Sequence, residues 1–250
     1  MGNRIHMAKL AEWCEEIGVP VGEKELSRIF TYFEELSGWN QKVNLVAKAT
    51  DEEILRKHFV DSLTCLPFIP EQQSLRLLDI GTGAGFPGLV LKVMRPDVVV
   101  HLLESSGKKC FFLKHVISTL KFDRVEILNG RAEHFAHIDE YRHKYDVVVC
   151  RAVAHLSVGC EYAFPFLRTD GLFIAQKGPS GMNELEEASG ALAVLGGEFK
   201  ESREFLLPGG EEKRLIFVFR KKNATPPEYP RREGVPSKKP LHGINVPRGT

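Results

Sequence analysis

Three glycines at alternate positions follow an acidic residue in the segment Asp79-Ile80-Gly81-Thr82-Gly83-Ala84-Gly85-Phe86-Pro87-Gly88. A short apolar run precedes this segment and further apolar residues follow it, so the pattern predicts a strand, a tight turn and a helix. Glycines without side chains let a flat or extended ligand lie directly against the backbone. We therefore predict that Asp79, Gly81, Gly83 and Gly85 form a cofactor-binding loop.

The spacing of the glycines separates two classes of cofactor. Dinucleotide-binding enzymes use G-x-G-x-x-G, in which the third glycine permits close packing of the helix. Counting from Gly81, that position holds the bulky Phe86. The observed G-x-G-x-G spacing favours S-adenosylmethionine. The sequence leaves open whether Phe86 closes over the methionine part of this cofactor or packs beneath the loop.

Two acidic residues follow the next two expected strands. Glu104 ends the second strand, 23 residues after Gly81, where a carboxylate can accept hydrogen bonds from both hydroxyls of a ribose. The third strand leads to Asn129-Gly130-Arg131-Ala132-Glu133, which could present backbone groups and a side chain to an adenine ring. The alternatives are that Glu104 caps a following helix and that Glu133 is a surface residue.

From Leu75 onward, short apolar runs alternate with amphipathic segments, which is typical of a parallel sheet covered by helices. The link from Leu206 to Lys213 is too short for a crossover helix, so the last two strands should pair antiparallel. This predicts an α/β protein with a Rossmann-like class I methyltransferase fold, whose seven-stranded sheet is mostly parallel with an antiparallel last strand. The expected strands are Arg76 to Ile80, Val98 to Leu103, Val125 to Leu128, Asp146 to Cys150, Gly171 to Gln176, about Phe199 to Phe205, and Leu215 to Arg220. The expected helices are Pro87 to Met94, Lys108 to Leu120, His155 to Phe166, and Asn183 to Leu195.

The apolar residues before the sheet, from about Met7 to Phe68, fall at helical spacing and predict an N-terminal helical subdomain. Thr50 or Asp51 offers an N-cap for a helix from about Glu52 to Leu66. Residues 1–7 lack a periodic pattern and contain a second methionine, so we expect an expression leader there. The predicted division is a helical cap at 1–70, a cofactor-dependent methyltransferase domain at 71–222 and a basic, proline-rich tail at 223–250.

The composition excludes several classes of protein. With 43% hydrophobic and 27% charged residues over 250 positions, the chain resembles an ordinary globular protein. It contains no apolar run of about 18 residues, so we expect no membrane segment and a cytoplasmic location. The five cysteines are odd in number and include no pair two residues apart, which favours reduced thiols and no structural metal. A monomer is the expected state.

Charge is distributed unevenly along the chain. The segment from Arg220 to Thr250 holds eight basic and two acidic residues, which leaves 26 basic and 31 acidic residues in the rest. A basic arm on an acidic body favours an anionic macromolecular partner. The alternative is a solvated tail without a partner.

Several separate motifs, taken in order, are similar to one known family. They are Trp39-Asn40 followed by Asn44-Leu45, His58-Phe59-Val60-Asp61-Ser62, Cys150-Arg151-Ala152, Gln176-Lys177-Gly178, the segment from Leu207-Pro208 to Arg214, and the tail motifs Tyr229-Pro230-Arg231-Arg232 and Lys238-Lys239-Pro240-Leu241. With the glycine loop, they resemble the bacterial 16S ribosomal RNA guanine-N7 methyltransferase family, RsmG, also called glucose-inhibited division protein B. The resemblance runs from about Tyr32 to the end.

The resemblance implies transfer of a methyl group from S-adenosylmethionine to N7 of a guanine in a loop of 16S ribosomal RNA near the decoding region. The expected partner is therefore 16S rRNA or the small ribosomal subunit. Some members carry Asp where this chain has Glu104, and either acid can serve a ribose. The resemblance also implies which residues line the cofactor site: Gly81, Phe86, Ala132 with Glu133, and Arg151. Glu104 is added to them because of its place at the end of the second strand.

The chemistry of guanine N7 requires little of the protein, because N7 exposes a lone pair and needs no prior deprotonation. Positioning alone can supply roughly 7 to 11 kcal/mol of a barrier. Cytosine-C5 methylation needs a cysteine nucleophile, but Cys150 is followed by Arg151 and the chain has no Pro-Cys pair. The Asp/Asn-Pro-Pro-aromatic turn of adenine-N6 enzymes is also absent from the sequence after the fourth strand.

Two alternatives to this function stay open. The chain could methylate a small molecule or a protein, or it could be a nucleotide-binding scaffold whose glycine loop is a relic.

Four residues are candidates for holding the guanine or a phosphate: Arg151, Lys177, His58 and Asp61. Arg151 follows the fourth strand, at the edge where such folds bind ligands, although it could instead pair with a carboxylate. His58 and Asp61 lie within about one helical turn, and a histidine there could also be a packing residue. Lys177 follows the fifth strand and could equally be a solvated lysine.

Overall fold

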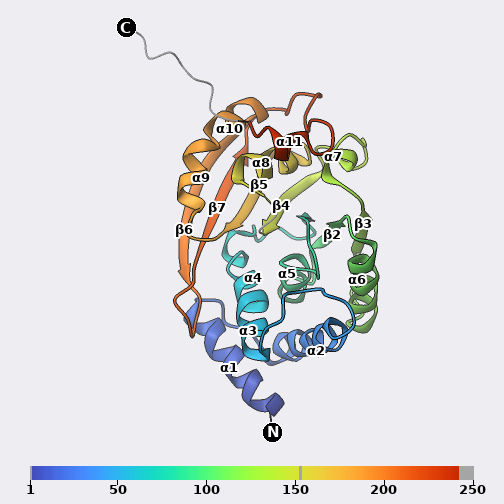
Figure 1. Ribbon diagram of the computed structural model, residues 1–250, viewed down its shortest axis with the longest axis vertical. Helices are drawn as coiled ribbons and strands as arrows, with labels where there is room; N and C mark the ends of the chain where they lie inside the picture. The colour runs from blue at the N-terminus through green and yellow to red at the C-terminus, as the bar shows by residue number, and fades with distance from the viewer. Residues whose placement is uncertain (1, 152–153, 242–250) are drawn as a thin grey trace.

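The protein is built around one seven-stranded sheet, seen in the computed structural model, which describes residues 2–151 and 154–241 (Figure 1). The sheet order is β3-β2-β1-β4-β5-β7-β6. Met1 of the expected leader, Ala152 of the Cys150 motif and the tail beyond residue 241 lie outside the described residues. The strands are β1 (Arg76–Ile80), β2 (Val99–Glu104), β3 (Val125–Asn129), β4 (Tyr145–Arg151), β5 (Leu167–Lys177), β6 (Gly197–Leu206) and β7 (Lys213–Lys221).

Strand directions confirm the predicted Rossmann-like class I topology. Strands β1 to β5 pair in parallel, and β7 runs antiparallel between β5 and β6. A short turn joins β6 to β7, and its ends are tied by the bond from Leu207 N to Glu212 O at 2.9 Å. Because β7 is reversed, its amino-terminal end lies at the edge of the sheet where the parallel strands have their carboxyl ends.

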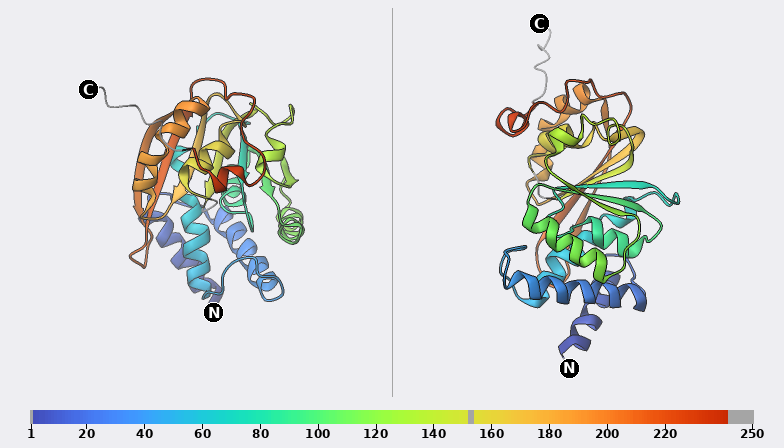
Figure 2. Two further views of the ribbon diagram at one scale, coloured as in Figure 1. Left: turned by 45° about the horizontal axis from the view of Figure 1, so that its top comes forward. Right: turned by 90° about the vertical axis from the view of Figure 1, so that its right-hand side faces the viewer.

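Helices cover both faces of the sheet (Figure 2). Alternate residues of a strand point to opposite faces, so Leu77 packs into one apolar core while Leu78 packs into the other. The first core holds the N-terminal helices together with α5 and α6, and the second holds α7 to α10, with α11 packed on the outside of α8. The first group is α1 (Gly2–Glu16), α2 (Glu23–Asn40), α3 (Asp51–Ile54), the π-helix η1 (Leu55–Val60), α4 (Asp61–Leu63), the 3-10 turn η2 (Leu66–Phe68), α5 (Gly88–Met94) and α6 (Gly107–Thr119). The second group is α7 (Ala132–Phe135), α8 (Leu156–Ala163), α9 (Gly181–Glu187), α10 (Ser189–Leu195) and α11 (Val235–Lys238).

The prediction of one regular helix from Glu52 to Leu66 is wrong in its middle. The start is as expected, because the Thr50 side chain and Glu53 form a reciprocal capping box. Six residues then form a wider π-turn, and the N–H of Asp61 bonds the carbonyls of Arg56 and His58. The extra residue in this turn changes the direction of the side chains after it, a change that apolar spacing does not reveal.

The single helix predicted from Asn183 to Leu195 is also corrected, because the structure has two helices there. Helix α9 ends in a tightened turn at Ala188, whose N–H bonds the carbonyls of Glu184 and Glu186. Helix α10 then ends at Gly196, which has a left-handed φ of 79°.

The C-terminal segment, over its described part, lies against the body of the protein. Thr225 Oγ1 donates to Leu195 O at 2.9 Å, and Arg231 bonds the buried carboxylate of Glu161. Lys221 is 1% exposed at the end of β7. The alternative of a wholly solvated tail is therefore wrong for residues 222–241.

Three further findings concern the described residues. No helix among them is long and apolar enough to cross a membrane. The five cysteines are buried, and none of them forms a disulfide. Within residues 2–151 and 154–241, no group of three or more histidine, cysteine, aspartate or glutamate side chains is placed to hold a metal ion.

Two glycines test how closely the second core is packed. A Cβ atom at Gly197 would overlap the ring of the fully buried Phe164, whereas at Gly159 it would make an ordinary contact 3.5 Å from the ring of Phe173. We expect Gly197→Ala to lower the free energy of unfolding by about 1 to 3 kcal/mol through overpacking. Gly159→Ala, inside α8, should raise it by up to about 1 kcal/mol. Urea denaturation measures both, and equal effects would contradict this packing.

Candidate functional site

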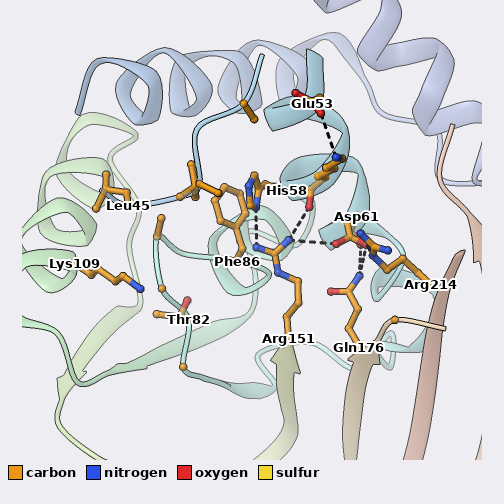
Figure 3. Close-up of a pocket in the computed structure, with 18 of the residues that line it drawn as sticks. Leu45, Glu53, His58, Asp61, Thr82, Phe86, Lys109, Arg151, Gln176 and Arg214 are labelled. Carbon is orange, nitrogen blue, oxygen red and sulfur yellow. Dashed lines mark hydrogen bonds and ion pairs between the residues drawn. The ribbon is translucent and has the colours of Figure 1, made fainter. Parts of the chain in front are cut away.

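The carboxyl ends of the parallel strands meet at a cavity of about 570 Å³ (Figure 3). Its wall includes the glycine loop after β1, Arg151 from β4, and Gln176 with Lys177 from β5. The π-helix η1 supplies the opposite wall through Lys57 and His58. The cavity therefore lies between the sheet and the N-terminal helices, at the edge where doubly wound folds bind ligands.

Asp79 organises the glycine loop from the end of β1. Its Oδ2 accepts hydrogen bonds from Thr82 Oγ1 at 2.6 Å and Gly88 N at 2.8 Å. The other oxygen, Oδ1, is buried without a hydrogen-bond partner, and burial raises the pKa of this carboxyl to about 6. Asp79 therefore holds the two ends of the loop together.

The three alternating glycines have left-handed backbones. Their φ angles are 68° at Gly81, 63° at Gly83 and 98° at Gly85, which side chains with a Cβ rarely adopt. A Cβ at Gly85 would also overlap the hydroxyl of Tyr32, which comes from α2. The N–H of Gly83 donates to Glu104 Oε2 at 2.9 Å, so the loop is tied to the end of β2.

A second, smaller cavity of about 80 Å³ adjoins the loop, and Gly81 lines both cavities. Glu104, Ala132 and Glu133, which the sequence places on the adenosine side as a prediction, line this smaller cavity together. Its full lining is Ile80, Gly81, Leu103, Glu104, Ser105, Gly130, Arg131, Ala132, Glu133 and Tyr162. Glu133 is only 8% exposed, so the alternative prediction that it is a surface residue is wrong.

The Glu104 carboxylate bonds the backbone at two points and also lines the small cavity. Its Oε1 accepts from Ser106 N at 2.7 Å, just before α6, while its Oε2 accepts from the glycine loop. The carboxylate also lines the small cavity. Since each carboxylate oxygen has two acceptor sites, these backbone bonds leave capacity for a ligand hydroxyl.

Phe86 packs beneath the loop and also lines the larger cavity. It is 2% exposed, and its ring stacks on Tyr32 with centroids 5.5 Å apart and planes 3° apart. The guanidinium of Arg151 lies 5.1 Å from the ring centroid on the cavity side. Of the two possibilities that the sequence left open for Phe86, the structure therefore supports packing beneath the loop.

Asp61 is the centre of the polar cluster in Figure 3. Its carboxylate, 2% exposed, accepts from Arg151 Nη1 at 3.3 Å, Arg214 Nε at 3.0 Å and Gln176 Nε2 at 2.8 Å. Arg151 pairs with a carboxylate and also lines the cavity, so the two positions that the sequence offered for it do not exclude each other. The sequence reasoning missed Arg214, which the reversal of β7 brings to this edge, and gave no role to Gln176.

His58 is a neutral acceptor in this cluster. Arg151 Nη2 lies 3.0 Å from His58 Nδ1, and a guanidinium can only donate, so Nδ1 carries no proton. Burial and the charge of Arg151 lower the pKa of His58 to about 3. Arg151 Nη1 also donates to the carbonyl of Lys57 at 3.0 Å. His58 and Lys57 therefore orient Arg151 from the π-helix.

The cations that line the larger cavity differ in how they are compensated. Lys177 bonds the Ala154 carbonyl and pairs with Glu184 at 2.9 Å. The alternative prediction that Lys177 is merely solvated is therefore wrong. Lys57 pairs with Glu53 at 3.2 Å. Lys48 and Lys109, in contrast, have no ion pair with any described residue. These two lysines carry the uncompensated positive charge of the wall.

A short segment after α2 forms part of the rim and explains the motif Trp39-Asn40 with Asn44-Leu45. Asn40 Oδ1 accepts from Leu45 N at 2.8 Å and from Val46 N at 3.0 Å. Residues 45–49 line the cavity directly after this anchor. Sequence reasoning assigned Asn40 no role of its own, because the N–H groups that donate to it lie in a turn without periodic spacing.

Comparison with known proteins covers most of the chain. A profile of the family described as rRNA small subunit methyltransferase G matches residues 25–213. A relative from Desulfitobacterium hafniense, named Ribosomal RNA small subunit methyltransferase G, is 44% identical over 91% of this chain and 94% of its own. A protein of the same name from Alkaliphilus metalliredigens is 40% identical over 93% of this chain and 97% of its own.

Similar solved structures support the fold alone. TrmN from Thermus thermophilus aligns with a TM-score of 0.51 and 17% identity, over 65% of this chain and 48% of its own. TYW2 from M. jannaschii, solved in complex with AdoMet, has a TM-score of 0.50 at 13% identity, over 65% of this chain and 76% of its own.

The hydroxyl of Tyr32 offers a direct test of the loop, because it donates to the carbonyl of Ala84 inside the glycine turn. We expect Tyr32→Phe, which keeps the ring and leaves a buried acceptor unpaired, to lower the free energy of unfolding by about 1 to 3 kcal/mol. Tyr141→Phe is the control, since its hydroxyl lies 3.5 Å from Glu126 and away from the loop. Denaturant titration compares them, and an unchanged Tyr32→Phe variant would show that this bond does not hold the turn.

Proposed function

This chain belongs to the rRNA small subunit methyltransferase G family, and from that premise we propose that its two joined cavities carry out methyl transfer to N7 of a guanine in 16S ribosomal RNA. The protein is an S-adenosylmethionine-dependent methyltransferase that acts on RNA of the small ribosomal subunit. The observation that carries the proposal is that Gly81 lines both cavities. A small cavity with a carboxylate suited to a ribose therefore adjoins a larger cavity lined with cations.

The residues present fit the cofactor. Glu104 offers carboxylate oxygens for the ribose hydroxyls, and Ala132 with Glu133 lines the same small cavity. Asp79 keeps a buried acceptor without a partner beside the loop, and the absence of side chains at the glycines leaves the backbone open to a ligand. When bound, S-adenosylmethionine supplies a methyl group that its sulfonium charge makes electrophilic.

We assign the larger cavity to the guanine and its neighbouring phosphates. Arg151 is held by three acceptors and presents its guanidinium next to Phe86, so it can orient a base or a phosphate without moving. Lys177 lies on the same wall, and Asp61 and His58 act by positioning Arg151. Lys48 and Lys109 are free to neutralise phosphates.

The proposed chemistry needs no general base. The N7 lone pair would form the new bond to a methyl carbon that the bound cofactor would supply, and the cofactor would keep the electrons of its broken carbon–sulfur bond. No proton leaves N7, so no side chain has to accept one. This agrees with a site whose histidine is already an acceptor for Arg151 and whose carboxylate is bound by two arginines. The contribution of the protein is then orientation and exclusion of water.

We propose that the three parts of the chain divide this work. The helical cap, residues 1–70, forms the rim and holds Arg151. Residues 71–222 bind the cofactor, and the tail supports the body through its described residues, 223–241. We further propose that the protein acts as a monomer in the cytoplasm, on 16S rRNA or the small ribosomal subunit.

Methyl transfer to small ribosomal subunits tests the proposal. The subunits come from cells that lack this protein, the cofactor carries a labelled methyl group, and the 16S rRNA is digested and mapped by mass spectrometry. We expect one new 7-methylguanosine. Label in another base would overturn the N7 assignment, and label in proteins or small molecules would favour the alternative acceptor.

The pH dependence of the reaction follows from the site. The pKa of His58 is lowered to about 3 and N7 loses no proton, whereas burial raises the pKa of Asp79 in the glycine loop to about 6. We therefore expect kcat/KM to stay nearly constant between about pH 7 and pH 8. His58→Asn should lower the rate by loosening Arg151 and leave this flat profile unchanged. An inflection near pH 6.5 in the wild type that disappears in His58→Asn would contradict a positioning role.

Phosphate binding by the uncompensated lysines can be measured by filter binding to 16S rRNA at several salt concentrations. We expect Lys109→Met to weaken binding and to lower the slope of log affinity against log salt by about one. Lys121→Met removes the same charge near the other end of α6, roughly 18 Å along the helix axis. If both variants lose affinity equally, the effect is a general one of net charge.

A further inference from the structure

The C-terminal segment from 225 to 239, which we call the strap, bonds two residues that line the small cavity. The N–H of Gly234 donates to Glu133 Oε1 at 3.2 Å. The hydroxyl of Tyr162, from α8, shares a hydrogen bond with Ser237 Oγ at 3.1 Å. Figure 1 shows the helix of the strap, α11, beside α7 and α8. The strap thus contacts the outer side of the wall that we assign to adenosine.

A buried ion pair fastens the strap to α8. Glu161 is 0% exposed and accepts three N–H groups of Arg231, from the backbone N at 2.8 Å, Nε at 2.9 Å and Nη2 at 2.6 Å. A buried carboxylate is strongly destabilising when it loses its partner. Glu161 therefore keeps Arg231 in place. A second pair, Arg131 with Glu233 at 3.3 Å, is exposed on both sides and adds little.

The first half of the strap is tied by Arg142. Its guanidinium donates to the carbonyls of Thr225 at 3.2 Å, Pro226 at 3.0 Å and Tyr229 at 2.8 Å. Each of these carbonyls belongs to irregular backbone without a strand or helix partner. Arg142 and Arg231 therefore fasten the two halves of the strap to the body.

The wall behind the strap is built on a single helical turn. Helix α7 has four residues, a single turn, and it carries both Ala132 and Glu133 into the small cavity. An isolated turn of this length is unstable in water, because one turn orders several residues for a single hydrogen bond. The strap supplies tertiary contacts to this turn at Glu133 and to its neighbour Tyr162.

We propose that the strap is a positioning element for the cofactor site, and that the Arg231–Glu161 pair sets the affinity for S-adenosylmethionine by keeping the adenosine wall in place. This inference rests on the proposed function, because it takes the small cavity as the adenosine site. It also assigns to Arg231 a role other than the neutralisation of RNA phosphates. Binding of the cofactor and docking of the strap then favour each other reciprocally.

Two charge-matched variants of the full-length protein separate these roles. Arg231→Met removes the fastening cation, whereas Arg232→Met removes an exposed cation that has no ion pair with any described residue. We expect Arg231→Met to raise the Kd for S-adenosylhomocysteine, measured by calorimetry without RNA, about tenfold or more. Arg232→Met should change it by less than about twofold. Equal Kd values in Arg231→Met and wild type overturn the inference.

Limited proteolysis of the wild type gives a second test that needs no variant. Arg232 and Lys238 are exposed trypsin sites in the strap. Saturating S-adenosylhomocysteine should slow cleavage at these sites by severalfold, followed by mass spectrometry, and cleavage at an unchanged rate overturns the inference. A wild type that binds neither S-adenosylmethionine nor S-adenosylhomocysteine instead overturns the proposed function, and the strap with it.

Discussion

The site depends on the ion pairs that the buried Asp61 carboxylate forms with two arginines. A buried charge is costly unless it is paired and hydrogen-bonded, so this carboxylate requires Arg151 and Arg214 at the same point. Those arginines come from β4 and β7, while Asp61 follows the π-helix. One electrostatic requirement therefore fixes the helical cap against the sheet and fixes the guanidinium that faces the cavity.

The glycine loop is held by the same layer of helices. Asp79 closes the loop from the strand side, and the Tyr32 hydroxyl bonds a carbonyl inside the turn from the helical side. The Phe86 ring contacts both the Tyr32 ring and the Arg151 guanidinium, so the loop and the polar cluster share a wall. The cap is therefore part of the cofactor site as well as the rim of the substrate cavity, which explains why one apolar core includes both.

The charges of the larger cavity suit a reaction governed by orientation. Arg151, Arg214 and Lys177 are each paired with a carboxylate, so they are rigid and their field is partly cancelled. Lys48 and Lys109 stay uncompensated near the opening and can attract phosphates. A rigid interior and a cationic rim separate the binding of an RNA backbone from the orientation of one base.

The sequence by itself determined the fold class, the glycine loop and the acid after β2, because strand periodicity, glycine spacing and distance along the chain are local signals. It also determined which residues approach the cavity from the carboxyl ends of parallel strands, Arg151 and Lys177 among them. Only the tertiary structure decided that Arg214 joins them, since this depends on the reversal of β7, and that the π-turn directs His58 toward Arg151. It alone decided the position of the tail: composition showed a basic segment, but the partner of Arg231 is a buried carboxylate 70 residues away, and such pairing depends on packing in three dimensions.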